Sequence, residues 1–104
     1  MTGRPAAFCF GPGHLVVYGN PAFISTFGEA VVGLPAREIL VDLPGAAFEL
    51  MDAVLDSGKP LATWIPGDGE DWRLTVAPRV DPESNETYGV SFHLRARSDV
   101  PILA

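Results

Sequence analysis

The feature of this 104-residue chain that most constrains its fold is one short segment that carries both the start and the stop signal of a helix. Asn20 can cap a helix with its side-chain oxygen, and Pro21 suits the first helical position because its missing N–H would be unpaired there. Gly28 can end the helix in a left-handed conformation. Phe23 and Phe27 share one side of such a helix. We therefore predict a helix of about two turns with one buried face.

Strands are expected on both sides of this helix. Residues 6–10 are apolar throughout, which is typical of a strand buried on both sides or placed in the centre of a sheet. A Gly-Pro-Gly turn joins them to a second apolar run at 14–18, so the two runs form a hairpin. Residues 46–57 have the period of an amphipathic helix. The remaining expected elements are a short helix at 36–40, a strand at 60–65, and two alternating, half-buried strands at 72–80 and 88–96.

These elements predict an α+β fold, a five-stranded antiparallel sheet with short helices and one longer helix packed on one face. The chain length suits one domain with one modest core. We expect a flexible N-terminal lead at 1–6, the domain itself at 7–97, and a C-terminal tail or linker at 98–104.

The order of these motifs resembles the PAS domain family. Members of that family have a β-strand that ends in an Asn, and this Asn caps the next helix, as Asn20 is expected to do. Here a Phe-Gly pair and the Val32-Gly33-Leu34-Pro35 turn follow, then the longer helix, the Gly58-Lys59-Pro60 turn and three strands. The resemblance covers residues 7–96. It implies a sensory or regulatory domain in signal transduction.

Composition excludes several classes of partner. The net charge is −6 and the chain has only seven Lys and Arg residues, which are not clustered, so we expect neither nucleic acid nor a membrane as a partner. The single Cys rules out an internal disulfide. The N-terminus has neither a basic region nor a long apolar run, so we expect a cytoplasmic protein without a signal peptide.

No arrangement of side chains in the sequence indicates catalysis or metal binding. His14 and His93 are the only histidines, and neither has a carboxylate or cysteine beside it at ligand spacing. Cys9 lies in an apolar strand that would raise its pKa, so we assign it to the core. We therefore expect no enzymatic activity. The carboxylates of the longer helix have the spacing of a solvated helix face and imply no acid–base pair: Glu49, Asp52 and Asp56.

The resemblance also raises the question of a cofactor, and the residues argue against haem and flavin. Haem-binding relatives supply a His from the longer helix, which has none here, and Met51 on an apolar stripe indicates packing. Flavin photosensors of the family carry an Asn-Cys-Arg-Phe-Leu-Gln motif, which is absent. The last strand ends in Arg95-Ala96-Arg97, without the Asp-Ile-Thr-like motif through which many relatives couple to a signalling helix.

Two functional hypotheses follow. In the first, a small apolar ligand lies between the sheet and the longer helix. In the second, side chains fill that space and the domain is a ligand-free protein-interaction or dimerisation module. An enzyme of unknown type is a distant third. The residues expected to line a ligand site share inward-facing stripes: Phe27, Ile39, Phe48, Met51, Leu55, Trp72, Leu74 and Phe92.

A homodimer is the expected assembly. Residues 100–104 are apolar, and exposed apolar segments usually mark a contact site. The outer face of the sheet, bearing Arg73, Thr75, Ser91 and His93, is expected to be mostly polar. We therefore expect the tail to dock near the sheet edge or the first strand, in its own subunit or across a two-fold axis.

Overall fold

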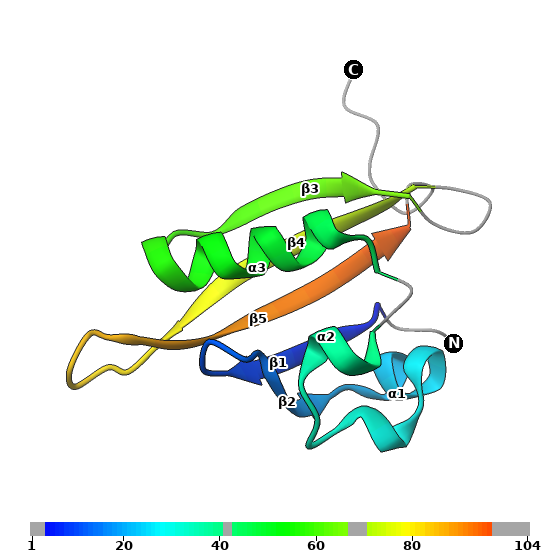
Figure 1. Cartoon of the computed structure of the whole chain (residues 1–104), viewed down its shortest axis with the longest axis horizontal. Coiled ribbons are helices and arrows are strands. Elements are labelled where there is room, and N and C mark those ends of the chain that lie inside the picture. Colours follow the sequence, from blue (N-terminus) through cyan, green and yellow to red (C-terminus); the bar gives the residue numbers. More distant parts are fainter. Residues whose placement is uncertain (1–3, 41–42, 67–70, 97–104) are drawn as a thin grey trace.

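The computed structural model describes residues 4–40, 43–66 and 71–96, and it confirms the predicted fold class. Five antiparallel strands form one sheet in the order β2-β1-β5-β4-β3 (Figure 1). The elements, in chain order, are β1 (Ala6–Phe10), β2 (Leu15–Gly19), α1 (Pro21–Phe27), the 3₁₀ helix η1 (Glu29–Val31), α2 (Ala36–Ile39), α3 (Gly45–Ser57), β3 (Leu61–Ile65), β4 (Trp72–Val80) and β5 (Thr87–Ala96).

The Asn20 side chain joins three parts of the chain. Its Oδ1 accepts hydrogen bonds from Phe23 N at 2.8 Å and from Ala6 N at 3.0 Å. Its Nδ2 donates to Arg4 O at 2.8 Å. The start of α1, the start of β1 and the residues before β1 are therefore held by one amide group. Pro21 occupies the first position of α1, as predicted.

Described residues before residue 7, where we expected the domain to begin, already contact the rest of the chain. Besides the bond from Asn20 to Arg4, the Pro5 carbonyl accepts from Leu94 N at 2.9 Å, and Ala6 already belongs to β1. Pro5 thus continues the pairing of β1 with β5 beyond the end of the strand, and only residues 1–3 of the expected lead lie outside the described part of the chain. The expected tail at 98–104 lies outside it as well.

Gly28 ends α1 in a different way from the one we predicted. Its φ of 94° is positive, but its ψ of 154° is extended, so the conformation is not left-handed helical. Side chains with a Cβ rarely adopt this region, and glycine is therefore needed here. Its N–H still closes the helix by donating to Ile24 O at 2.8 Å. The stop signal was predicted correctly, and its backbone geometry was not.

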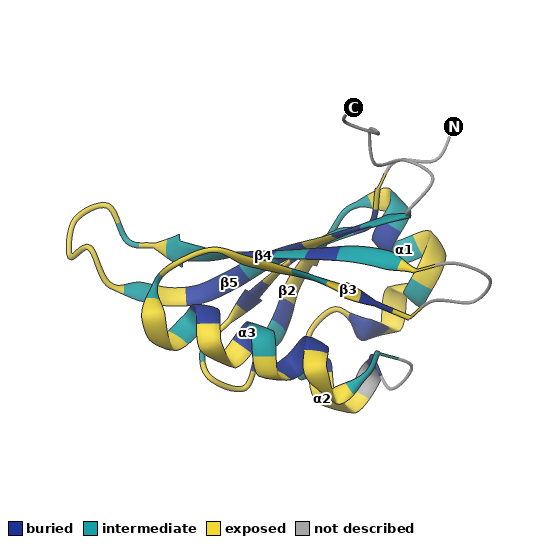
Figure 2. Ribbon diagram, turned by 90° about the horizontal axis from the view of Figure 1, so that it is seen from above, coloured by how far each residue is buried: buried dark blue, intermediate teal, exposed yellow. Residues whose placement is uncertain are grey.

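The core lies between α3 and one face of the sheet. The predicted apolar stripe of α3 supplies the buried residues Ala47, Phe48, Met51 and Val54. Figure 2 shows α3 lying along one side of the strands, with its exposed residues turned outward. The helix packs on β3, β4 and β5, whereas α1 packs on β1 and β2. The helix ends before Gly58, as predicted, and Gly58 has a left-handed conformation.

Strand β1 decides between the two alternatives that its apolar run left open. It does lie inside the sheet, between β2 and β5, but it is buried on one face only. Ala7 and Cys9 are fully buried, whereas Phe8 and Phe10 are 41% and 53% exposed. Successive side chains of a strand point to opposite faces, and α3 packs on only one of them. The apolar run therefore indicated a strand in the interior of the sheet, but this strand is not buried on both faces.

Replacing Asn20 by Ala should lower the free energy of unfolding by more than the ~1 kcal/mol of a simple helix cap. The reason is that the substitution also removes the partner of Ala6 N, a partly buried donor. Asn20→Asp keeps the acceptor oxygen but loses the bond to Arg4, so it should cost less. Denaturant titration measures both variants. Thr26→Ala, which removes an exposed bond to Ala22 O, is the control and should change stability little.

Candidate functional site

The residues predicted to line a ligand site do converge. Phe48 and Met51 on α3 and Leu74 and Phe92 on the sheet are buried in one hydrophobic cluster. Three further predicted residues are partly buried and pack against that cluster: Phe27, Leu55 and Trp72. Ile39 belongs to α2, but its side chain lies outside the described part of the structure.

Aromatic rings fill the end of this space near α1. The ring of Phe23 lies 4.8 Å from that of Phe27 and 5.9 Å from that of Phe92, measured between centroids. A Cβ added at Gly19 would come within 2.3 Å of the Phe23 ring. The glycine is therefore needed for the ring to pack. Because these rings occupy this end of the space, a ligand could lie there only if it displaced side chains.

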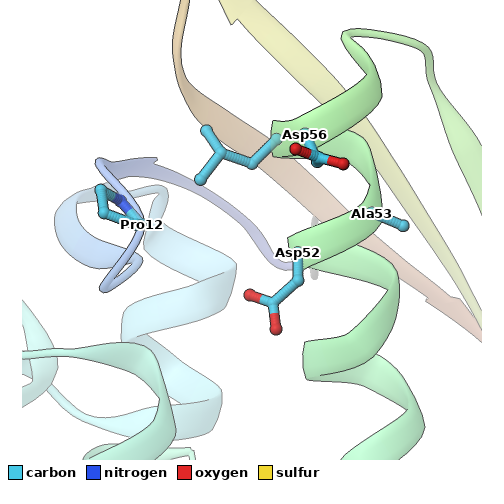
Figure 3. Close-up of a pocket in the computed structure, with 5 residues that line it drawn as sticks. Pro12, Asp52, Ala53 and Asp56 are labelled. Carbon is cyan, nitrogen blue, oxygen red and sulfur yellow. The ribbon is translucent and has the colours of Figure 1, made fainter.

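A surface hollow of about 580 Å³ lies at the other end of the core, between the β1–β2 turn and α3 (Figure 3). Leu55 belongs to both the hollow and the predicted set, and the other lining residues were not predicted. Two of them are carboxylates of α3, and Figure 3 shows that Asp52 extends from the helix on the side of the turn. The lining consists of Pro12, Asp52, Ala53, Leu55 and Asp56.

His14 lies beside this hollow, and it meets a carboxylate that the sequence spacing around it did not indicate. The side chain is fully buried, and its Nε2 lies 2.7 Å from Oδ1 of Asp52, a residue 38 positions away. Nδ1 is buried and has no hydrogen-bond partner among the described residues. His14 precedes β2 with a positive φ of 51°. The fold brings the two side chains together, which the spacing in the sequence does not indicate.

Arg37 extends this pair to a third element. It donates from Nη2 to Oδ2 of Asp52, and its guanidinium lies 5.2 Å from the centroid of the Phe48 ring. The Arg37 and Asp52 side chains are each about half exposed, so solvent screens their attraction. The network of His14, Asp52 and Arg37 links the β1–β2 turn, α3 and α2. We call it the acid–base clamp.

Comparison with known proteins identifies the fold. The sequence matches no protein-family model and no curated protein. The PAS domain of histidine kinase ThkA has a TM-score of 0.72 and 15% identity, covering 89% of this chain and 99% of that one. A sensory box sensor histidine kinase from Vibrio cholerae has a TM-score of 0.76 and 16% identity, covering 96% of this chain and 84% of that one. This chain has the PAS fold.

A third PAS-fold neighbour is part of a larger protein. VqmA from Vibrio cholerae, solved in a complex with ligand and DNA, has a TM-score of 0.75 and 19% identity. The match covers 98% of this chain and 49% of VqmA, so this chain spans about half of that protein. The sequence motifs around Asn20 thus predicted the fold correctly, although the identity to these neighbours is low.

The surroundings of the histidine and cysteine side chains limit the chemistry that this PAS-fold domain can perform. The unpartnered Nδ1 of His14 meets no hydroxyl or thiol to activate among the described residues. Burial raises the pKa of the Cys9 thiol to about 12, although the Arg79 charge opposes the rise. In the described part of the chain, no group of three His, Cys, Asp or Glu side chains could hold a metal ion. No described helix is both long and apolar enough to cross a membrane.

Replacing Asp52 by Ala should destabilise the domain by about 1–3 kcal/mol, because Nε2 of the buried His14 loses its partner. Asp56→Ala is the matched control: this carboxylate lines the same hollow one turn further along α3 and is exposed. Its removal should change the free energy of unfolding by less than about 0.5 kcal/mol. Equal losses for the two variants would contradict a specific role of Asp52.

The raised pKa of Cys9 predicts a loss of stability in alkali. The thiol ionises near pH 9.0 in the unfolded chain and near pH 12 in the folded one, so unfolding releases a proton between these values. This contribution is fully present below pH 9.0 and falls by up to about 1.4 kcal/mol per pH unit above it. Denaturant titrations over this range should show a shallower decline for Cys9→Ala. Identical pH profiles would refute the burial of the thiol.

Proposed function

We propose that this chain is a sensory or regulatory domain of a signal-transduction protein. The observation that carries the proposal is the PAS fold itself, which spans nearly the whole PAS domain of a histidine kinase. The neighbours are sensory domains, and the described residues place no nucleophile beside the one buried histidine. We therefore also propose that the domain itself is not an enzyme.

The signal we propose is a small apolar ligand between the sheet and α3. Support comes from one hydrophobic cluster, in which α3 and the sheet would both contact an apolar ligand. Its residues from the predicted set are Phe48, Met51, Leu74 and Phe92. VqmA, which shares the fold, is known in a form bound to DPO. The hollow at Leu55 adjoins the cluster and gives such a ligand an approach from the surface.

The second candidate is a protein-interaction module without a ligand. It is favoured by the close packing of Phe23, Phe27 and Phe92 and by the exposed aromatic residues of β1. In this case the core has a structural role, and the regulated property is contact with another protein.

The expectations about cofactors and location remain proposals. We propose that the domain binds neither haem nor flavin, since it lacks the ligand His and the flavin motif described above. A light-oxygen-voltage domain studied with a flavin analogue shares the fold, so an absorption spectrum of purified protein is a necessary check. We also propose a cytoplasmic location and no direct contact with nucleic acid, given the net charge of −6.

Native mass spectrometry of freshly purified protein tests the choice between ligand and no ligand. The ligand proposal predicts a retained small molecule that is lost on denaturation. It also predicts that Met51→Ala, at the proposed site, reduces this retention more than Val54→Ala, a buried control on the same helix. A spectrum of the unliganded mass alone, repeated after incubation with cell extract, would favour the interaction module.

We propose a homodimer, as expected from the apolar tail at 100–104, whose residues lie outside the described part of the structure. VqmA is known as a dimer, which supports the proposal. Light scattering of the full chain and of a chain ending at Arg97 should give a dimer and a monomer, respectively. A full chain that stays monomeric at all accessible concentrations would contradict it.

A further inference from the structure

Charge is segregated between the two sides of this domain. The five strands contain no Asp or Glu, although the whole chain has thirteen. Strands β4 and β5 carry three of its seven basic residues: Arg73, Arg79 and Arg95. Exposed carboxylates lie along α3 instead, on the other side of the molecule. The sheet is thus locally basic in a protein whose net charge is −6.

The face of the sheet turned away from α3 also carries exposed aromatic rings, which corrects our expectation of a mostly polar face. We call Phe8, Phe10, Tyr18 and Tyr88 the aromatic patch; their exposed fractions range from 38% to 53%. The Phe8 and Tyr18 rings lie 5.2 Å apart, and the Phe10 and Tyr88 rings 6.3 Å apart. Grouped exposed rings of this kind mark an interaction surface more often than isolated ones.

Arg79 lies at the centre of the aromatic patch. Its guanidinium is 4.8 Å from the centroid of Phe8 and 4.9 Å from that of Tyr88, and Nη1 donates to Cys9 O at 3.2 Å. Arg79 lies on β4 and reaches β1 by passing over β5. It crosses β5 at Gly89, its partner in the strand register, which has no side chain to block it. A cation is therefore held in a fixed position among exposed rings.

A second cation lies on the same face beside another exposed ring. The guanidinium of Arg73 is 5.3 Å from the centroid of Trp64, and Arg73 is the register partner of both Trp64 and Arg95. Like charges at directly opposite positions of neighbouring strands destabilise a sheet, so the Arg73–Arg95 pair favours a nearby anionic group. The face therefore combines apolar rings with cations that favour carboxylates.

We propose that this face binds an acidic, amphipathic segment of a partner protein, with aliphatic side chains over the aromatic patch and carboxylates beside Arg79 and Arg73. A second copy packed face to face is disfavoured, because it would bring the arginines of both copies together. Nucleic acid is disfavoured because the protein is acidic overall. The proposal adds a partner to the regulatory role and does not depend on a ligand in the core.

The test is a nuclear magnetic resonance titration of the full chain with a synthetic helical peptide of about four turns that has leucines on one face and glutamates flanking them. The expected result is saturable shifts at the aromatic patch and Arg79, weaker at high salt. The same peptide with lysine in place of glutamate should give no such shifts. Arg79→Glu should weaken binding at least about tenfold, whereas Lys59→Glu, at an exposed position just after α3, should not.

Phe10→Ser is a second variant, because Arg79 also bonds the backbone and its loss could perturb folding. Phe10 is 53% exposed, so its replacement should leave the fold intact and still weaken binding. Any of three results would overturn the proposal: equal binding of both peptides, shifts confined to α3, or tighter binding of a single-stranded oligonucleotide. Self-association that Phe10→Ser abolishes would also overturn it, by assigning the face to a second copy.

Discussion

The hydrogen bonds of the Asn20 side chain are the interaction on which the rest of this structure depends. Its oxygen accepts from Phe23 N in the first turn of α1 and from Ala6 N at the start of β1, and its amide nitrogen donates to Arg4 O, two residues before β1. These bonds fix where α1 leaves the sheet. The position of α1 in turn sets where Phe23 enters the core against Phe92. A local capping signal thereby determines tertiary packing.

The sequence predicted what depends on neighbouring residues. The alternation in β4 and β5 gave their inward faces, and the period of α3 gave its buried stripe, because both patterns repeat over several residues. The convergence of Phe48, Met51, Leu74 and Phe92 followed from these two patterns. Whether this space accepts a ligand depends on how closely the side chains pack, which no periodicity encodes.

What the sequence could not predict depends on contacts between distant residues. His14 and Asp52 are 38 positions apart, and neither belongs to a recognisable spacing, so the acid–base clamp emerged only from the fold. The outward direction of Phe8 and Phe10 was hidden because an apolar run has no visible alternation. Arg79 reaches Cys9 O only because the residue that lies between them on β5 is Gly89, which has no side chain to block the contact. Each case requires the strand order to be known first.

The domain thus has two different sides: an acidic helix side with a hollow, and a basic sheet side with exposed aromatic rings. The core lies between them, and the hydrogen bonds of Asn20 fix the position of α1 against it. If this account is right, the Ala6 and Phe23 amides, which share the Asn20 oxygen, open together. Amide hydrogen exchange measures this directly. The account predicts the same strong protection for both amides, close to that of the strand amides of β5. A Phe23 amide that exchanges at the rate of an exposed loop while Ala6 stays protected would contradict it.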